Sequence, residues 1–174
     1  RRLDEEIVDD EVGNDDLEIE QLELGSLASI RGFGERWVDG HETLDILINN
    51  AGVMACPQGT TDDGFERQFG TNHLGHFLLT GLVAPTLVAN GSGRIVNLSS
   101  RGHQRDDVHL DDVNFEHRDY DKWAAYGQAK PANVLHAVEL DRRLRDRNVR
   151  AFAVHPGTIM TDLSRHMQQQ DFEA

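Results

Sequence analysis

The sequence predicts an α/β fold, in which a parallel, doubly wound sheet and its helices form a single domain. Short apolar stretches alternate with longer stretches whose apolar residues recur every three or four positions. This alternation is typical of chains in which each strand is followed by a helix that leads to the next parallel strand. A length of 174 residues suits one domain with a sizeable core.

Four stretches are expected to form strands, because they are short and either mostly apolar or alternately apolar and polar. In chain order they are Leu17–Leu24, Leu44–Asn49, Arg94–Ser99 and Val149–Val154. Strands of this composition suit a sheet whose two faces are both covered by helices.

Three longer stretches are expected to form helices, because their apolar residues return with the period of an α-helix. They are Ser26–Val38, Phe65–Val88 and Trp123–Arg147. A serine stands at the start of the first, where its hydroxyl can cap the helix. The polar stretch Asp106–Asp121 lacks such a period and is expected to be a surface loop.

The charge balance excludes several function classes. With 31 acidic against 17 basic residues, the formal net charge of −14 leaves no electrostatic surface for nucleic acid or an anionic membrane. No apolar run is long enough to span a bilayer, and the first residues do not resemble a secretory signal. The single cysteine, Cys56, fits a reducing compartment, so a cytoplasmic location is expected. Only two residues are lysines, and an acidic, lysine-poor surface suggests adaptation to high salt.

Polar or glycine-containing stretches follow three of the predicted strands. They are Asn50-Ala51-Gly52, Ser99-Ser100 and His155-Pro156-Gly157. Any one of them alone could be a tight turn. Together they predict a ligand crevice, because the carboxyl ends of parallel strands line the binding edge of an open α/β sheet.

Tyr126 and Lys130 are four residues apart in a predicted helix, so they share one face. A phenol has a pKa of about 10 and is a poor base at neutral pH. A neighbouring ammonium stabilises the phenolate and lowers that pKa, so that the tyrosine could exchange a proton with an alcohol or carbonyl oxygen. The alternative is a tyrosine that merely packs beside a lysine stem.

Other candidate sites are weaker. His73 and His76 are three residues apart on a predicted helix and could share a metal ion, but no third ligand stands at a useful spacing, so no metal is expected. Cys56 has no base beside it in the sequence and is not expected to be a nucleophile.

Five stretches carry a resemblance to a known family. They are Leu47–Gly52, Thr71–Phe77, Arg94–Ser100, Tyr126-Gly127-Gln128-Ala129-Lys130 and His155–Thr161, in that order. The chain resembles the short-chain dehydrogenases/reductases, and the long spacing from Ser100 to Tyr126 is most similar to the retinol-dehydrogenase-like subgroup. The resemblance implies a Rossmann-like fold, NAD or NADP as cofactor, and an alcohol or carbonyl substrate.

The resemblance also implies a role for each matching residue. Tyr126 would be the acid/base, Lys130 would lower its pKa and bind the nicotinamide ribose, Ser100 would orient the substrate oxygen, and Asn72 would hold a water beside the lysine. The residues implied in cofactor binding, besides Tyr126 and Lys130, are Glu23, Asn50, Ala51, Gly52, Pro156, Gly157, Ile159 and Thr161.

One departure from the family pattern leaves two functions open. No Gly-x-x-x-Gly-x-Gly stretch precedes Asn50, so residues 1–174 are expected to form an incomplete NAD(P)-binding domain without the glycine-rich part or the C-terminal substrate-covering part. The first hypothesis is an oxidoreductase that transfers a hydride between NAD(P) and an alcohol/carbonyl pair. The second is a non-catalytic remnant or scaffold that does not bind cofactor on its own. Assembly into a homo-oligomer is left open by the sequence.

Overall fold

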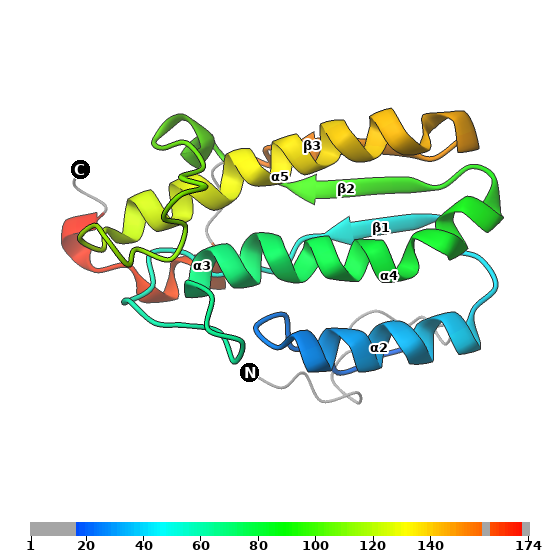
Figure 1. Cartoon of the computed structure of the whole chain (residues 1–174), viewed down its shortest axis with the longest axis horizontal. Coiled ribbons are helices and arrows are strands. Elements are labelled where there is room, and N and C mark those ends of the chain that lie inside the picture. The colour runs from blue at the N-terminus through cyan, green and yellow to red at the C-terminus, as the bar shows by residue number, and fades with distance from the viewer. Residues whose placement is uncertain (1–16, 158–160, 172–174) are drawn as a thin grey trace.

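The computed structural model describes residues 17–157 and 161–171, and its centre is a three-stranded parallel sheet (Figure 1). The strands β1 (Ile46–Asn49), β2 (Arg94–Leu98) and β3 (Arg150–Val154) lie in the order β1-β2-β3. In this register Asn49 lies beside Asn97, and Asn97 beside Ala153. The predicted strands 44–49, 94–99 and 149–154 are therefore confirmed, with ends that move by one or two residues.

The three predicted helices are also present. They are α2 (Leu27–Gly40), α4 (Gly75–Asn90), which continues α3 (Arg67–Phe69) and a π-helical turn (Gly70–Leu74), and α5 (Lys122–Leu144). Ser26 caps α2, as expected, by accepting a hydrogen bond from the Ser29 amide. Asp121 caps α5 by accepting from the amides of Trp123 and Ala124. No described helix has the length and apolar composition that crossing a bilayer requires.

The predicted strand Leu17–Leu24 is wrong: residues 17–23 form no ladder, and the segment ends in a turn before α2. The described sheet offers this segment no neighbouring strand, and a stretch with alternating apolar residues becomes a strand only when its backbone groups find partners. Its alternation serves packing instead. Leu24 is buried with Ile30 of α2 and Leu79 of α4, and Leu22 packs against the same cluster.

The described helices cover only one face of the sheet. α4 packs on β1, α5 packs on β2 and β3, and α2 packs on α4 (Figure 1). On the opposite face the side chains of Ile46, Ile48 and Phe152 are 45% to 59% exposed. The sequence predicts helices on both faces of the sheet, and the described residues provide helices for one face only.

Candidate active site

A crevice at the carboxyl end of the sheet brings together most of the predicted site residues. Its cavity of about 310 Å³ lies where residues after β1, β2 and β3 meet the first half of α5. This volume is at the low end of the range for small-molecule sites, roughly 300–1,000 Å³. The predicted residues that line it are Asn50, Gly52, Ser100, Tyr126, Lys130, Pro156, Gly157 and Thr161.

Three of the described predicted residues do not line this cavity. Asn72 lies behind it, where its side chain bonds the backbone of Val53. Ala51 is exposed beside Asn50 and Gly52. Glu23 accepts a hydrogen bond from the amide of Gly25 at 2.8 Å, just before α2. Ile159 is outside the described residues.

Tyr126 and Ser100 face each other across the crevice. The Tyr126 side chain is buried, its ring lies against Gly102 in the turn that follows β2, and Ser100 lies near enough to its hydroxyl to favour the phenolate. Gly102 permits this approach, because a Cβ there would lie 2.9 Å from Cε1 of the Tyr126 ring. The Ser100 hydroxyl also accepts from the Gly102 amide at 3.1 Å. A hydroxyl held in this way can share a substrate oxygen with a tyrosine.

The two adjacent serines have different tasks. The hydroxyl of Ser99 donates to the backbone carbonyl of Lys130 at 3.1 Å, so it ties β2 to α5. Ser100 keeps its hydroxyl toward Tyr126. Ser100 therefore stays the predicted substrate-orienting serine, because the Ser99 hydroxyl is already bonded to α5.

Lys130 lies one helical turn after Tyr126, under its ring. The Lys130 ammonium is 5.0 Å from the centre of the Tyr126 ring and donates to the Leu98 carbonyl at 3.3 Å. Among the described residues no carboxylate forms an ion pair with it. Burial lowers the pKa of Lys130 to about 8, because a charged group is poorly solvated there.

The expected lowering of the Tyr126 pKa by Lys130 is not found in this arrangement. Burial raises the pKa of the Tyr126 phenol, and the hydrogen bond to Ser100 opposes this only in part. The physical reason is that the ammonium contacts the ring face and donates to Leu98, while its charge does not bond the phenolic oxygen.

Asn72 has the buried partner that its place on an apolar stripe requires. It lies in the π-helical turn, 1% exposed, and its amide bonds the backbone N–H and C=O of Val53, both at 2.8 Å. These bonds fix the segment after β1. Gly52 is needed here, because a Cβ at this position would lie 2.9 Å from Oδ1 of Asn72.

The sequence reasoning missed a buried polar network behind the crevice. Asn49 donates to Asn97 at 2.8 Å and to Thr80 at 2.9 Å, and Asn97 in turn donates to the carbonyl of Asn133 at 3.3 Å. His73 bonds Oδ1 of Asn133 at 3.0 Å. The available signal was the presence of asparagines inside apolar strands and on an apolar helix face, where each needs a partner.

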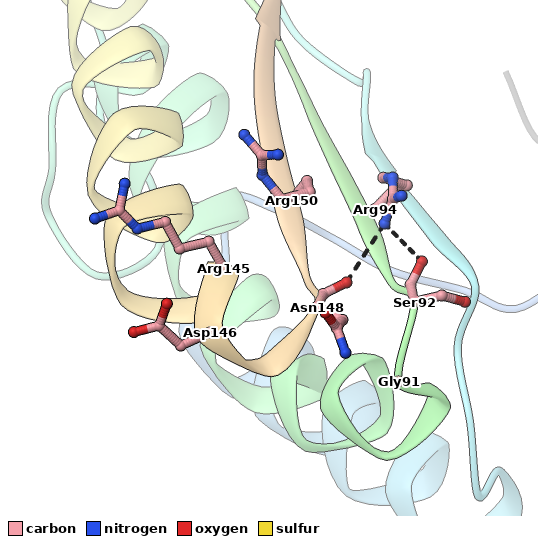
Figure 2. Close-up of a pocket in the computed structure, with 7 residues that line it drawn as sticks. All are labelled: Gly91, Ser92, Arg94, Arg145, Asp146, Asn148 and Arg150. Atoms are coloured by element: carbon pink, nitrogen blue, oxygen red, sulfur yellow. Dashed lines mark hydrogen bonds between the residues drawn. The ribbon is translucent and has the colours of Figure 1, made fainter.

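A larger cavity of about 610 Å³ lies at the opposite, amino end of the sheet (Figure 2). Arg94, Arg145 and Arg150 line it near the C-terminal ends of α4 and α5. Arg94 donates to the carbonyls of Ser92, Gly93 and Asn148, and Arg150 is paired with Asp141. Arg94 and Arg150 therefore satisfy backbone carbonyls in the connections that precede β2 and β3, and a carboxylate of α5. Within the described chain no group of three or more His, Cys, Asp or Glu side chains could hold a metal ion.

The chain is similar to several known proteins. The family model for short chain dehydrogenase matches residues 4–111. Retinol dehydrogenase 13 of Homo sapiens is 50% identical over 153 residues, which cover 88% of this chain and 46% of that protein. Retinol dehydrogenase 14 of Homo sapiens is 44% identical over 155 residues, covering 89% of this chain and 46% of that protein. The chain thus spans about half the length of the curated relatives it matches.

A solved structure supports the fold. The crystal structure of an uncharacterized protein from Mycobacterium Paratuberculosis is similar with a TM-score of 0.74 and 46% identity, covering 86% of this chain and 53% of that one. The predicted α/β class with a parallel sheet is confirmed by this likeness and by the strand order.

Proposed function

The chain belongs to the short-chain dehydrogenase family, and from this membership and its crevice we propose that it serves an NAD(P)-dependent oxidoreductase. The reaction is a hydride transfer between the nicotinamide of NAD or NADP and the carbon of an alcohol/carbonyl pair. The observation that carries the proposal is the convergence of Ser100, Tyr126 and Lys130 in one cavity at the carboxyl end of the sheet.

The chain's own residues handle the proton and the orientation of the substrate. Tyr126 passes a proton to or from the substrate oxygen, and Ser100 holds that oxygen by a hydrogen bond. Lys130 lies below the Tyr126 ring and supplies a cation that binds ribose hydroxyls. Asn72 has one amide hydrogen and one oxygen lone pair left after its bonds to Val53, and these hold the proposed water.

The residues of the crevice fit one end of a dinucleotide. Asn50, Gly52, Pro156, Gly157 and Thr161 line a cavity that suits a nicotinamide and its ribose. When bound, the nicotinamide supplies the hydride chemistry. Ala51, Glu23 and Ile159 complete the proposed cofactor contacts, with Glu23 toward the adenine. The glycine-rich turn that usually holds the pyrophosphate does not occur in these 174 residues.

The proposed substrate class follows the names of the relatives. Two of them are named retinol dehydrogenases, so we propose an apolar alcohol or aldehyde of this kind. A panel of retinal, a medium-chain aldehyde and a short ketone, each with NADH and NADPH, tests this class.

The decisive variant is Tyr126→Phe, because it removes the hydroxyl and keeps the ring. We expect turnover to fall by about a hundredfold or more, the range for loss of a general acid/base. The chain offers a matched control, since Tyr120 is its other tyrosine and its hydroxyl donates to the Cys56 carbonyl at 3.0 Å, away from the crevice. Tyr120→Phe should leave turnover unchanged. Equal turnover by the wild type and Tyr126→Phe would refute the role of Tyr126.

Calorimetric titration with NAD and NADP separates this proposal from the alternative of a non-catalytic remnant or scaffold. Micromolar binding to the chain supports the enzyme. Absence of binding together with absence of turnover in the panel favours the alternative.

A further inference from the structure

The side chain of Asn133 forms hydrogen bonds to segments that carry residues of the candidate active site. It lies on α5, one turn after Lys130, and is 3% exposed. Its Nδ2 donates to the backbone carbonyls of Asn72 and Leu98, both at 3.1 Å. Its Oδ1 accepts from Nδ1 of His73 at 3.0 Å, because an amide oxygen can only accept. One side chain therefore joins α5, the end of β2 and the π-helical turn.

The Leu98 carbonyl is the acceptor that Asn133 shares with Lys130. Asn133 Nδ2 donates to it at 3.1 Å and the Lys130 ammonium at 3.3 Å. A carbonyl oxygen has two lone pairs, so these two donors saturate it. The ammonium is thus held at an acceptor whose own position Asn133 fixes.

The Asn72 carbonyl also receives two side-chain donors. It accepts from Asn133 Nδ2 and from Nδ1 of His76, both at 3.1 Å. Its backbone is therefore held while its side chain fixes Val53 and the segment after β1. The side-chain amide of Asn133 therefore helps to fix the positions of both Asn72 and Lys130, the residues proposed to hold the water and the cation beside Tyr126.

We propose that Asn133 is a positioning residue for the reaction, which fixes the Lys130 ammonium and the Asn72 backbone through the two carbonyls that its amide joins. This inference rests on the proposed function for its meaning in catalysis. The geometry itself can be tested without turnover.

The neighbourhood of Lys130 makes it a sensitive reporter. Tyr126 on the same helix and His76 at the start of α4 lie near it, and Arg101 and His155 line the same cavity. The Leu98 carbonyl at the end of β2 accepts from the Lys130 ammonium, and the hydroxyl of the next residue, Ser99, donates to the Lys130 backbone carbonyl. Burial leaves the pKa of Lys130 near 8, so its titration can be followed at moderate pH.

The experiment uses the whole chain with lysine labelled at ¹³Cε, which gives two signals because Lys122 and Lys130 are its only lysines. Lys122→Arg assigns them. In the wild type a fixed Lys130 should show two distinct Hε shifts. In Asn133→Leu, which keeps a similar size but donates nothing, they should merge toward one averaged shift while Lys122 is unchanged.

Gln128→Leu is the matched control, because Gln128 is a buried amide on the same helix that bonds Val113 and Arg118 instead. It should leave the Lys130 signals as they are. Unchanged Hε shifts in folded Asn133→Leu would overturn the inference. If that variant does not fold, Asn133→Asp decides: its carboxylate should raise the Lys130 midpoint by about one pKa unit or more, and an unchanged midpoint overturns the inference.

Turnover measurements distinguish failure of the proposed oxidoreductase function from failure of the proposed role of Asn133. Where the wild type reduces a carbonyl, Asn133→Leu should lower kcat by about tenfold or more, because small misplacements of catalytic groups are costly. Gln128→Leu should not. A wild type without turnover contradicts the proposed function, whereas the NMR arm still decides whether Asn133 positions Lys130.

Discussion

At the carboxyl end of the sheet Lys130 is a buried cation held by a backbone carbonyl, whereas at the amino end Arg150 is half-exposed and paired with Asp141 at 2.6 Å. Arg94 at that end is likewise engaged by three carbonyls. A buried cation without a counter-charge lowers the stability of the folded state. An exposed ion pair changes that stability only slightly in either direction. The arginines that line the larger cavity are therefore accounted for by their structural contacts. The buried charge of Lys130 in the smaller cavity destabilises the fold, so its presence points to a role other than stability.

Removing the Lys130 charge should give the largest effect. Lys130→Met should lower turnover by about a hundredfold or more, and the same protein should gain stability toward urea at neutral pH. Arg94→Met, at the other end, should keep its turnover. A Lys130→Met protein that keeps its turnover and is less stable than the wild type would contradict the proposed difference between Lys130 and the arginines at the amino end of the sheet.

The pH dependence of stability tests whether the buried charge of Lys130 destabilises the folded chain. The pKa of Lys130 is lowered to about 8 from 10.5, so the unfolded chain binds more protons than the folded one between these values. Stability should therefore rise with pH from about 8 toward 10, and below 8 the burial cost is present in full. The rise attributable to Lys130 is about 3 kcal/mol at most. Urea unfolding at pH 7.5 and 10 should show it in the wild type but not in Lys130→Met.

His76 is a second buried base on the covered face of the sheet, and it should respond to acid. Burial lowers its pKa to about 4 from 6.5, so stability is lost as the pH falls through this window, when the unfolded chain takes up the proton first. His76→Gln keeps a donor for the Asn72 carbonyl but does not titrate. We expect it to lose less stability than the wild type between pH 6.5 and 4, by up to about 3 kcal/mol. Identical acid profiles would show that His76 is not held neutral.

The ion pair at the amino end should give the smallest effect. Arg150→Ala removes its pair with Asp141, and both partners reach solvent. The melting temperature should change by much less than in Lys130→Met, because solvent screens exposed ion pairs. Calorimetric melting of the two variants side by side measures this. A larger change in melting temperature in Arg150→Ala than in Lys130→Met would reverse the comparison.

Two segments show why sequence reasoning reached some elements and not others. Ser26–Val38 contains its own cap and its own apolar period, so local chemistry is enough to define α2. Leu17–Leu24 has an alternating pattern just as clear, yet it forms no strand because its backbone has no neighbouring strand in the described chain. A helix satisfies its hydrogen bonds within one segment, and a strand depends on another.

The site divides in the same way. The spacing from Tyr126 to Lys130 was enough to place both on one helix face, and glycine and serine after successive strands were enough to predict the crevice. Asn133 could not be singled out, because its partners Asn72, His73 and Leu98 are distant in sequence. The direction of the Tyr126 pKa shift could not be predicted from the spacing, because it depends on burial and on the contact of Lys130 with Leu98, which exist only in the folded chain.

The sequence by itself determined the alternation of helices and strands, the parallel sheet and the edge at which the predicted site residues gather, because these follow from local periodicity and chain direction. Only the tertiary structure decided which strand pattern found a partner, which serine faces Tyr126 and what holds Lys130. These depend on contacts between segments that are distant along the chain, and such contacts leave no local periodic signal in the sequence.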